Sequence, residues 1–481
     1  MGDTGCFISQ TTNLYHDNHK TRRLFSMERF FHLKEHNTDV KTEVIAGITT
    51  FLTMAYILAV NPNILGAVMD RSGVFIATAV ASAIATFIMA FYANYPIALS
   101  AGLGLNAYFV IVCQTELKDV ANPFTICLTA VFVEGLIFIL LSFFKAREQI
   151  INVIPMNLKN GISAGIGLFV AYIGLQSAGI VQFIWQDNGG VLIQLGSFSS
   201  PQMVLALIGF IITVVLVHYD MKGAVLVGIL ATWILGLIAE FTGWYQVGNG
   251  NYSLIPDFST GFQLSGITLT AFHFNFGWVA SHLVQFIAIV FSFLYVDIFD
   301  TVGTIVGVAD KAGLLDKDGK LPKVGNVLMA DAIGTVTGAC LGTSTITSFV
   351  ESSAGVAAGG RTGLTAFVTG IMFLLSLLLS PVFLAIPGFA TAPALVYVGM
   401  LMVSSAKKID FESDIADTVG AYMAMLMMPL CYSIATGIMF SILTWVLIKT
   451  FEGKVKEIHP VMWIIFLLFA IRICTLVFNF Q

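Results

Sequence analysis

Charged residues are scarce in this chain. Only 11% of its 481 residues are Asp, Glu, Lys or Arg, whereas about a quarter of a soluble domain is usually charged. So few charges cannot cover the water-exposed surface of a protein of this length, which nearly excludes a soluble enzyme. Hydrophobic residues make up 57% of the chain. At about 20 residues for each crossing, this is enough for about thirteen or fourteen transmembrane helices.

Three further features that the sequence lacks limit the kinds of protein that this chain can be. The six cysteines are scattered and form no C-x-x-C pair, so we expect neither disulfides nor structural zinc. No basic stripe of the kind that binds nucleic acid is present in the sequence. The first 43 residues are polar and show no signal-peptide pattern. We expect residues 1–43 to form a cytoplasmic N-terminal tail.

Apolar runs predict fourteen membrane spans. They cover about 44–61, 74–93, 96–114, 122–143, 153–180, 201–218, 223–241, 278–308, 326–342, 343–358, 363–380, 390–406, 414–431 and 433–448. Lys and Arg gather in alternate connections, such as 144–160 and 309–325, whereas 181–200, 242–277 and 381–389 contain none. Because basic connections stay on the cytoplasmic side, this alternation predicts a cytoplasmic N-terminus.

A further apolar run covers 461–478 and carries Arg472 near its middle. A cation at the centre of a bilayer costs at least about 2.5–3.5 kcal/mol. Two interpretations stay open. The run either lies in the membrane interface or forms a fifteenth crossing from which Arg472 reaches toward the headgroups.

Two short segments resemble each other. Residues 81–86 read Ala-Ser-Ala-Ile-Ala-Thr, and residues 330–335 read Ala-Asp-Ala-Ile-Gly-Thr. Each belongs to the second span of a half that contains seven spans. Because seven is odd, the second half starts on the opposite side of the membrane. Such an inverted repeat is typical of transporters.

The third span of each half is irregular. Residues 95–106 are rich in glycine, and residues 342–355 join a polar, β-branched stretch to small residues. Irregular or extended backbone is tolerated at membrane depth only inside protein or beside a water-filled cavity. Paired interrupted spans in matching positions indicate a substrate site. The alternative is a pair of glycine-rich helix-packing surfaces.

Five acidic residues lie within the predicted spans and away from their first and last turns. They are Glu134, Asp297, Asp300, Asp331 and Glu351. Carboxylates are costly in hydrocarbon, so each should face a cavity or a partner. The i, i+3 spacing of Asp297 and Asp300 puts both on one helical face. Asp300 and Glu351 are the strongest functional candidates. Asp331 is expected to cap its span or to lie near the membrane edge, and Glu134 to bond to a neighbouring helix.

Four ordered motifs resemble those of the azaguanine-type purine permeases, a branch of the nucleobase–ascorbate transporter superfamily. They are Ala-Gly-Ile-Thr-Thr-Phe-Leu-Thr-Met-Ala-Tyr at 46–56, Gly-Leu-Gly-Leu-Asn-Ala at 102–107, Phe-Asp-Thr-Val-Gly-Thr at 299–304, and Glu-Ser-Ser-Ala-Gly at 351–355 with Gly-Gly-Arg-Thr-Gly at 359–363. The resemblance covers nearly everything from Glu28 to the last span.

The resemblance implies an all-α polytopic fold of about fourteen transmembrane helices in two inverted seven-helix repeats. Short antiparallel strands are expected in spans three and ten. The implied division has five parts after the tail: core domain at 44–143 and 278–380, gate domain at 144–246 and 386–448, and a C-terminal basic segment with the extra apolar run at 449–481. The core would move against the gate like an elevator.

The resemblance also implies the site. Asp300 takes the role of the acidic residue in span eight, Glu351 that in span ten, and Asn106 that of span three. Related uracil permeases carry a His where this chain has Thr304, so a His-based proton relay is not carried over. The predicted substrate-binding residues are Thr53, Tyr56, Gly104, Asn106, Asp300, Thr304, Glu351 and Ser352. The predicted proton-coupling residues are Asp297, Asp300 and Glu351.

These features predict a secondary transporter in the plasma or bacterial inner membrane, not an enzyme. The expected partner is a purine base, hypoxanthine or guanine with adenine as an alternative, imported with protons. No cofactor or metal is expected, although sodium stays open as the coupling ion, and the gate domain is a candidate dimer surface. The alternatives are an anion exchanger of the same fold, a uracil or xanthine permease, and, more remotely, a membrane-embedded enzyme. The last would need a nucleophile–base pair or clustered metal ligands, and no H-E-x-x-H or G-x-S-x-G occurs.

Overall fold

The structure is a computed structural model of the 481-residue chain. It describes residues 28, 30–143, 153–185, 191–248, 252–258, 264–311, 321–322, 324–412 and 414–478. Within these ranges it describes no side chain at 183–185, 191–192, 264, 299–300, 302–303, 306–307, 309–311, 471–472 and 474–478. Asp300 and Arg472 therefore have a described backbone only, and most of the tail 1–43 lies outside the described residues.

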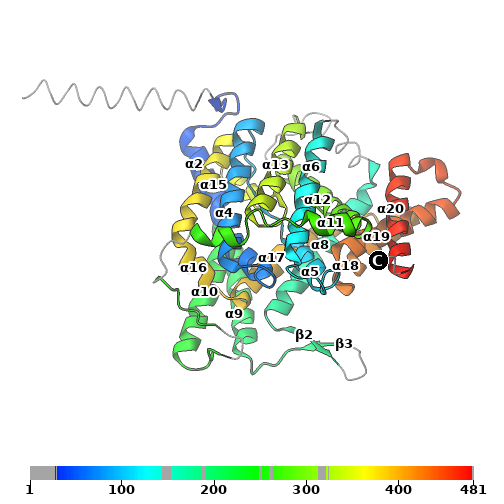
Figure 1. The fold of residues 1–481 in the computed structure, drawn as a ribbon. Helices are drawn as coiled ribbons and strands as arrows, with labels where there is room; N and C mark the ends of the chain where they lie inside the picture. Colours follow the sequence, from blue (N-terminus) through cyan, green and yellow to red (C-terminus); the bar gives the residue numbers. More distant parts are fainter. Residues whose placement is uncertain are drawn as a thin grey trace, which may run out of the picture.

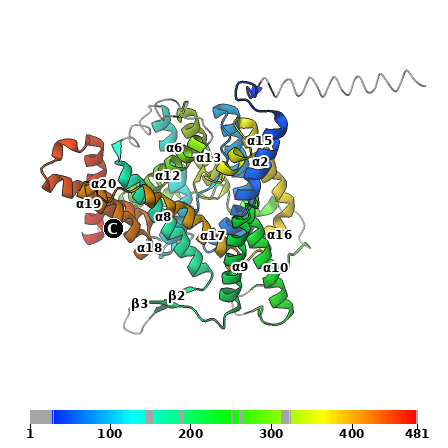
Figure 2. The same ribbon diagram turned by 180° about the vertical axis from the view of Figure 1, so that it is seen from behind.

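The first half of the chain forms seven consecutive segments in the described part. These are α2–α3 (Val40–Met54 and Ile57–Leu65), α4–η1 (Arg71–Ile88 and Met89–Ala93), β1–α5 (Leu99–Ala101 and Leu103–Gln114), α6 (Phe124–Phe143), α8 (Met156–Ser177), α9 (Pro201–His218) and α10 (Ala224–Phe241). A hairpin of β2 (Val181–Trp185) and β3 (Val191–Leu195) follows α8 and projects from the helices (Figures 1 and 2).

The second half repeats this order in the described part of the chain. It contains α12 (Leu283–Lys311), α13 (Val324–Leu341), β4–α14 (Ile346–Ser348 and Ser352–Ala357), α15–η3–α16 (Gly363–Ser376, Leu377–Leu379 and Ser380–Ala385), α17–η4 (Gly388–Val403 and Ser404–Lys408), α18 (Ile415–Leu430) and α19 (Ile434–Phe451). Short helices η2 (Leu264–Leu269) and α11 (Phe276–Ser281) precede it, and η5 (Val455–Glu457) and α20 (Pro460–Phe478) follow it. The fourteen predicted spans correspond to these fourteen segments, and the run at 461–478 is the helix α20.

The third segment of each half begins with a strand. β1 and β4 pair antiparallel, with Leu99 opposite Ser348 and Ala101 opposite Ile346. All six strand residues are buried. Each strand leads into a helix, β1 into α5 and β4 into α14. The backbone at this depth therefore satisfies its hydrogen bonds by pairing inside the protein, as irregular membrane segments must.

The repeated sequence motif holds these strands in place. In the first half, Thr86 on α4 donates to Leu99 O and accepts from Leu99 N. In the second half, Thr335 on α13 donates to Ile346 O at 3.1 Å. Leu99 and Ile346 are the first residues of their strands, so the two threonines make equivalent contacts. This equivalence fits the inverted-repeat architecture.

Asp331 does not lie where we expected it. It is buried, with no exposed area, in the interior of α13, and its Oδ1 accepts from Ser348 N at 3.2 Å. The expectation of a helix cap or a membrane-edge position was wrong. The backbone N–H of the neighbouring strand supplies the polar partner that a carboxylate at this depth requires.

Two groups of helices have extensive internal contacts. The first group, called here the strand-bearing set, contains β1, β4 and the helices α2, α4, α5, α6 and α12–α15. In it, α6 packs against α13 and α12, α15 packs against α2 and α4, and α14 packs against α2. In the flanking set, α8 packs against α17 and α18, α10 against α9, and α18 against α19. Contacts between the two sets, such as α5 with α8 and α10 with α2, are less extensive. Figure 1 places α2, α4 and α15 at one side and α18, α19 and α20 at the other.

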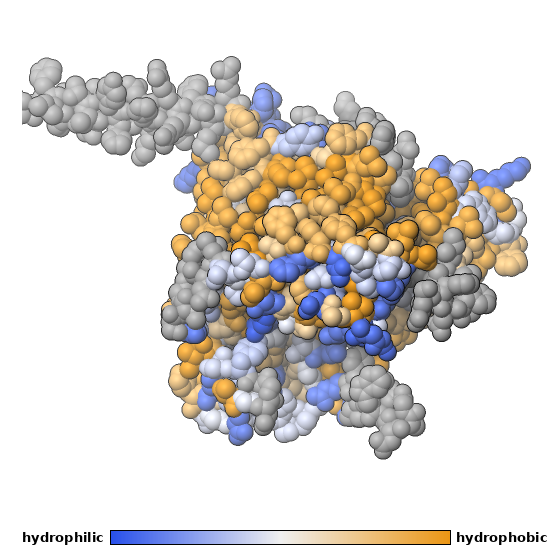
Figure 3. Space-filling model, viewed as in Figure 1, coloured by the Kyte–Doolittle hydropathy of each residue, from blue (hydrophilic) through white to orange (hydrophobic). Residues whose placement is uncertain are grey.

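The outer surface suits a bilayer. Ten helices or helix pairs within the described residues are long and apolar enough to cross a membrane. Large apolar side chains are exposed along α9 and α10, including Ile211, Val215, Ile234 and Ile238. A broad apolar area covers the upper part of the face in Figure 3, and polar residues gather below it. The chain is a multi-pass membrane protein.

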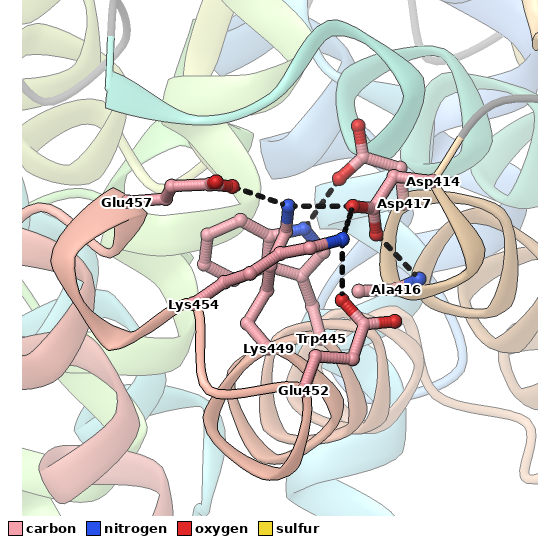
Figure 4. Close-up of polar contacts among 8 residues, drawn as sticks. All are labelled: Asp414, Ala416, Asp417, Trp445, Lys449, Glu452, Lys454 and Glu457. Carbon is pink, nitrogen blue, oxygen red and sulfur yellow. Dashed lines mark hydrogen bonds and ion pairs between the residues drawn. The ribbon is translucent and has the colours of Figure 1, made fainter.

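A network of ion pairs fixes the start of α18 to the end of α19 (Figure 4). Asp414 caps α18 by accepting from Ala416 N, and it also accepts from Lys449 Nζ at 2.9 Å and Lys454 Nζ at 2.6 Å. Lys449 is bonded in addition to Glu457, at 2.9 Å. Lys449 is 6% exposed, so it requires such partners.

Candidate functional site

The main cavity lies between the strand-bearing set and the flanking set. Its volume is about 700 Å³, within the range of small-molecule sites. Residues from α2, the start of α5, α8, α12 and α14, and from 397–408, contribute to its wall. Of the predicted substrate-binding residues, those that line it are Thr53, Tyr56, Gly104, Thr304 and Glu351.

Glu351 is the central polar group of this cavity. It lies between β4 and α14, three residues after the last strand residue. Tyr56 lies at the break between α2 and α3, where it is fully buried. The Tyr56 hydroxyl donates to Glu351 Oε1 at 2.5 Å. The bond fixes one carboxylate oxygen across 295 residues of sequence.

Close packing of α14 on α2 makes this bond geometrically feasible. Gly355 faces α2, and a Cβ at this position would lie 2.7 Å from Ala46 O and would also collide with Thr50 Oγ1. Thr53 Oγ1 lies 3.4 Å from Glu351 O, although it donates at a shorter distance, 2.8 Å, within its own helix to Thr50 O. The glycine therefore allows the approach that brings Glu351 to Tyr56.

Asn106 and Ser352 do not belong to the cavity wall formed by the described residues. Asn106 is fully buried, and its Oδ1 accepts from the Ser344 hydroxyl. Ser352 Oγ accepts from Ala98 N at 3.0 Å, immediately before β1. Both side chains hold the segments that carry the strands. Their direct contact with substrate stays a prediction.

The acidic residues of α12 divide into two cases. The Asp300 side chain lies outside the described residues, so its predicted role stays a prediction, but Thr304 one turn later lines the cavity. Asp297 is fully buried and does not belong to the described cavity wall. Thr301 Oγ1 lies 3.0 Å from both Asp297 Oδ1 and Asp331 Oδ2.

The comparisons with known proteins agree with this architecture. Residues 41–440 match the Permease family. A guanine/hypoxanthine permease of Bacillus subtilis is 45% identical over 448 residues, which cover 92% of this chain and 99% of that protein. An adenine permease of Escherichia coli is 40% identical over 448 residues, with 93% and 96% covered. The chain belongs to the permease family.

The fold of this permease is found in a solved structure of a different transporter. The transmembrane domain of a cyanobacterial bicarbonate transporter superposes with a TM-score of 0.60 at 15% sequence identity. The match covers 82% of this chain and 97% of that one. At this identity the likeness shows the shared fold alone.

Three hydrogen bonds of the permease in and around the strand region were not predicted from the sequence. Thr345 donates to Glu134 Oε2 at 3.1 Å, so Glu134 on α6 bonds to the segment before β4. Thr301 contacts Asp297 and Asp331 as described above. The i, i+4 spacing of Asp297 and Thr301 could have signalled their contact. No local pattern signals the contact with Thr345, because the two residues are 211 positions apart.

The mouth of the cavity in the permease carries exposed charges. Asp220, Lys222 and Lys408 line it, and all three are exposed. The interior near Glu351 instead presents hydroxyl groups and small residues. Among the described residues, no group of three or more His, Cys, Asp or Glu side chains could hold a metal ion.

Proposed function

We propose that this chain imports purine nucleobases together with protons. One observation carries the proposal: a cavity of about 700 Å³ contains a single acidic side chain in its described wall away from the mouth, Glu351, held by Tyr56. An ionised carboxylate only accepts hydrogen bonds. With Oε1 bonded to Tyr56, its remaining lone pairs can accept N–H groups from the edge of a planar base.

The names of the relatives support the same substrate class. The similar proteins are named guanine/hypoxanthine permeases and adenine permeases. We favour hypoxanthine or guanine for this chain, with adenine as the second candidate. Asp300, on the helix that brings Thr304 to the cavity, would make a further contact with the base or bind the coupling proton. Asn106 and Ser352, which lie outside the described cavity wall, would make further contacts with the base.

Elevator-like movement is supported by the two sets of helices. The strand-bearing set corresponds to the proposed core domain, 44–143 and 278–380, and the flanking set to the gate domain, 144–246 and 386–448. If one set slid against the other, the limited contacts between the sets would break and new ones would form. Lys222 and Lys408 at the cavity mouth support an opening toward the cytoplasm, together with a cytoplasmic N-terminus. Dimer formation through the gate domain would place exposed apolar side chains of α9 and α10 against a second copy or lipid.

Uptake in cells that lack their own purine permeases tests this function. We expect labelled hypoxanthine or guanine to accumulate, and a protonophore to abolish the accumulation. A panel of unlabelled bases, including adenine, uracil and xanthine, would identify the preferred substrate by competition. Accumulation that ignores the protonophore but requires sodium would reject proton coupling.

The second candidate is anion exchange, since the bicarbonate transporter shares the fold. An anion site would present a cation or backbone N–H groups to its ligand, whereas Glu351 presents negative charge. We therefore expect chloride, sulfate and bicarbonate not to compete with the labelled base. Competition by one of these anions, without competition by purines, would favour the exchanger.

A further inference from the structure

Two buried carboxylates meet at one hydroxyl outside the described wall of the main cavity. Thr301 Oγ1 on α12 lies 3.0 Å from Asp297 Oδ1 and 3.0 Å from Asp331 Oδ2 on α13. None of the three side chains has exposed area. Because Thr301 follows Asp297 by four residues, both lie on the face of α12 that meets α13.

The number of hydrogens at this contact limits its charge. A threonine hydroxyl has one hydrogen and donates one hydrogen bond at a time. If both carboxylates were ionised, one of the two contacts would oppose oxygen lone pairs, at a place without water access. A proton on one carboxylate satisfies both contacts. The protonated carboxyl group then donates to Thr301 Oγ1, and Thr301 donates to the other carboxylate.

Other ionisable groups lie on the elements around this pair of carboxylates. Ionisable side chains on α12, α13 and the elements packed against them, or directly beside these elements, are Asp70, Arg71, Tyr92, Tyr108, Cys113, Cys127, Glu134, Lys159, Tyr172, His282, Tyr295, Cys340, Glu351, Lys449 and Glu452. The side chains of Asp300, Asp310, Lys311 and Arg472 lie outside the described residues. Arg71, Lys159 and Lys449 belong to the end turns of α4, α8 and α19. Asp297 and Asp331 instead occupy helix interiors, with Glu134 and Glu351 as further acids.

The internal repeat shows that a carboxylate is not needed to brace a strand. Ser82 holds the position in residues 81–86 that Asp331 holds in 330–335. Ser82 braces β1 through a 2.7 Å hydrogen bond with Ser100. Asp331 braces β4 through Ser348 N. Because the hydroxyl of Ser82 is enough to brace β1, bracing alone does not require a carboxylate at Asp331. Unlike a hydroxyl, the carboxylate of Asp331 can also bind a proton.

We propose that Asp297, Thr301 and Asp331 form the site that carries the coupling proton. Glu351 is thereby left to bind the base. This inference rests on the proposed proton-coupled purine transport, and it names the group that is protonated. Asp331 contacts Ser348, the last residue of β4, and Glu351 lies three residues further along. A change in the protonation of this pair can therefore be transmitted to Glu351 through the short segment 348–351. The step is reversible binding of one proton to a carboxylate, with no other bond made or broken.

Paired transport assays test the proposal. Vesicles containing the full chain are assayed for accumulation of labelled hypoxanthine under a pH difference of one unit, and for exchange of labelled against unlabelled base without a gradient. One proton for each base sustains up to about tenfold accumulation under this gradient. The variants are Asp297→Asn, Asp331→Asn, Asp331→Ser, Thr301→Val and Thr301→Ser. Thr337→Val is the matched control, because the hydrogen bond of the Thr337 hydroxyl among the described residues stays within α13, to Ile333 O.

We expect Asp297→Asn and Asp331→Asn to keep exchange within about threefold of the parent protein but to lose accumulation, with a ratio near one. Asp331→Ser copies the arrangement at Ser82 and should behave in the same way. Thr301→Val should shift the pH dependence of accumulation, whereas Thr301→Ser and Thr337→Val should not.

The proposal is overturned if the Asn variants accumulate base with the parent's pH dependence, or if they reach the vesicles and lose exchange as well. Should the Asn variants fail to reach the membrane, the comparison of Thr301→Val with Thr301→Ser decides: equal pH profiles overturn the proposal. If the parent protein transports no purine at all, the proposed function itself fails. A parent protein that exchanges purines without any pH-driven accumulation would contradict proton coupling as a whole.

Discussion

Replacing Glu351 with Gln is the sharpest perturbation of the proposed site. The two side chains have nearly the same shape, so the cavity wall should be preserved. In Glu351→Gln the side-chain carbonyl can still accept from the Tyr56 hydroxyl, which is bonded to Oε1 at 2.5 Å in the parent protein. The amide NH₂ then takes the place of the free carboxylate oxygen, and a donor faces the N–H groups of the base.

The size of the effect follows from the lost contact. A hydrogen bond to a charged group contributes about 1.5–3 kcal/mol. At 1.4 kcal/mol for each factor of ten, KM for hypoxanthine should rise about tenfold to 150-fold. The assay is the initial rate of labelled uptake over a range of concentrations, corrected for the amount of protein in the membrane.

Asp220→Asn provides the matched control. Asp220 also lines the cavity but is exposed at its mouth. The variant removes one negative charge from the same cavity, and we expect KM to change less than about threefold because exposed charges are screened by solvent. A KM for Glu351→Gln that stays within the range of Asp220→Asn would refute the binding role of Glu351.

Three other outcomes are expected. Tyr56→Phe frees Glu351 Oε1 and should raise KM about twofold to tenfold, the worth of one orienting hydrogen bond of about 0.5–1.5 kcal/mol, as measured by the same uptake assay. Gly355→Ala should lower the unfolding temperature of the purified protein and reduce uptake, because overpacking against α2 costs about 1–3 kcal/mol; an unchanged melting curve would contradict the packing argument. Asp414→Ala removes both a helix cap and two ion pairs and should destabilise the protein by about 2 kcal/mol, whereas Asp414→Asn keeps the cap and should cost less. The hydrogen bond from Lys454, and then those from Lys449 and Ala416 N, holds the pKa of Asp414 well below its usual range. The contribution of its ion pairs is therefore complete above about pH 4 and is lost as the pH falls through the lowered pKa. Thermal unfolding of the parent and of Asp414→Asn should converge on acidification, because both then keep the cap without the ion pairs, and a difference between them that persists would contradict the ion-pair account.

Much of the architecture could be predicted from hydropathy. The apolar runs located the fourteen segments because lipid exposure demands long apolar stretches. The irregular third spans predicted the interrupted segments that form β1 and β4, since their glycine and β-branched residues do not suit a lipid-facing helix. The separate helix α11 was not predicted, because the apolar run from 278 continues across the break at His282.

The site was only partly predictable. Candidate residues could be chosen because acids are rare in apolar spans, but their surroundings depend on contacts between distant segments. Nothing local to Glu351 indicates its bond to Tyr56. Asp331 was misplaced because its partner, Ser348 N, belongs to the following strand. The motif shared by 81–86 and 330–335 could have indicated that Asp331 contacts a strand. The second and sixth residues of this motif contact β1 in the first half and β4 in the second half.

A structure determined with bound hypoxanthine would show whether Glu351 binds the base. We expect the base in the cavity between the strand-bearing set and the flanking set, with a ring N–H within hydrogen-bond distance of Glu351 and with Tyr56 still bonded to that carboxylate. A base bound elsewhere, or one in the cavity without contact to Glu351, would contradict this expectation.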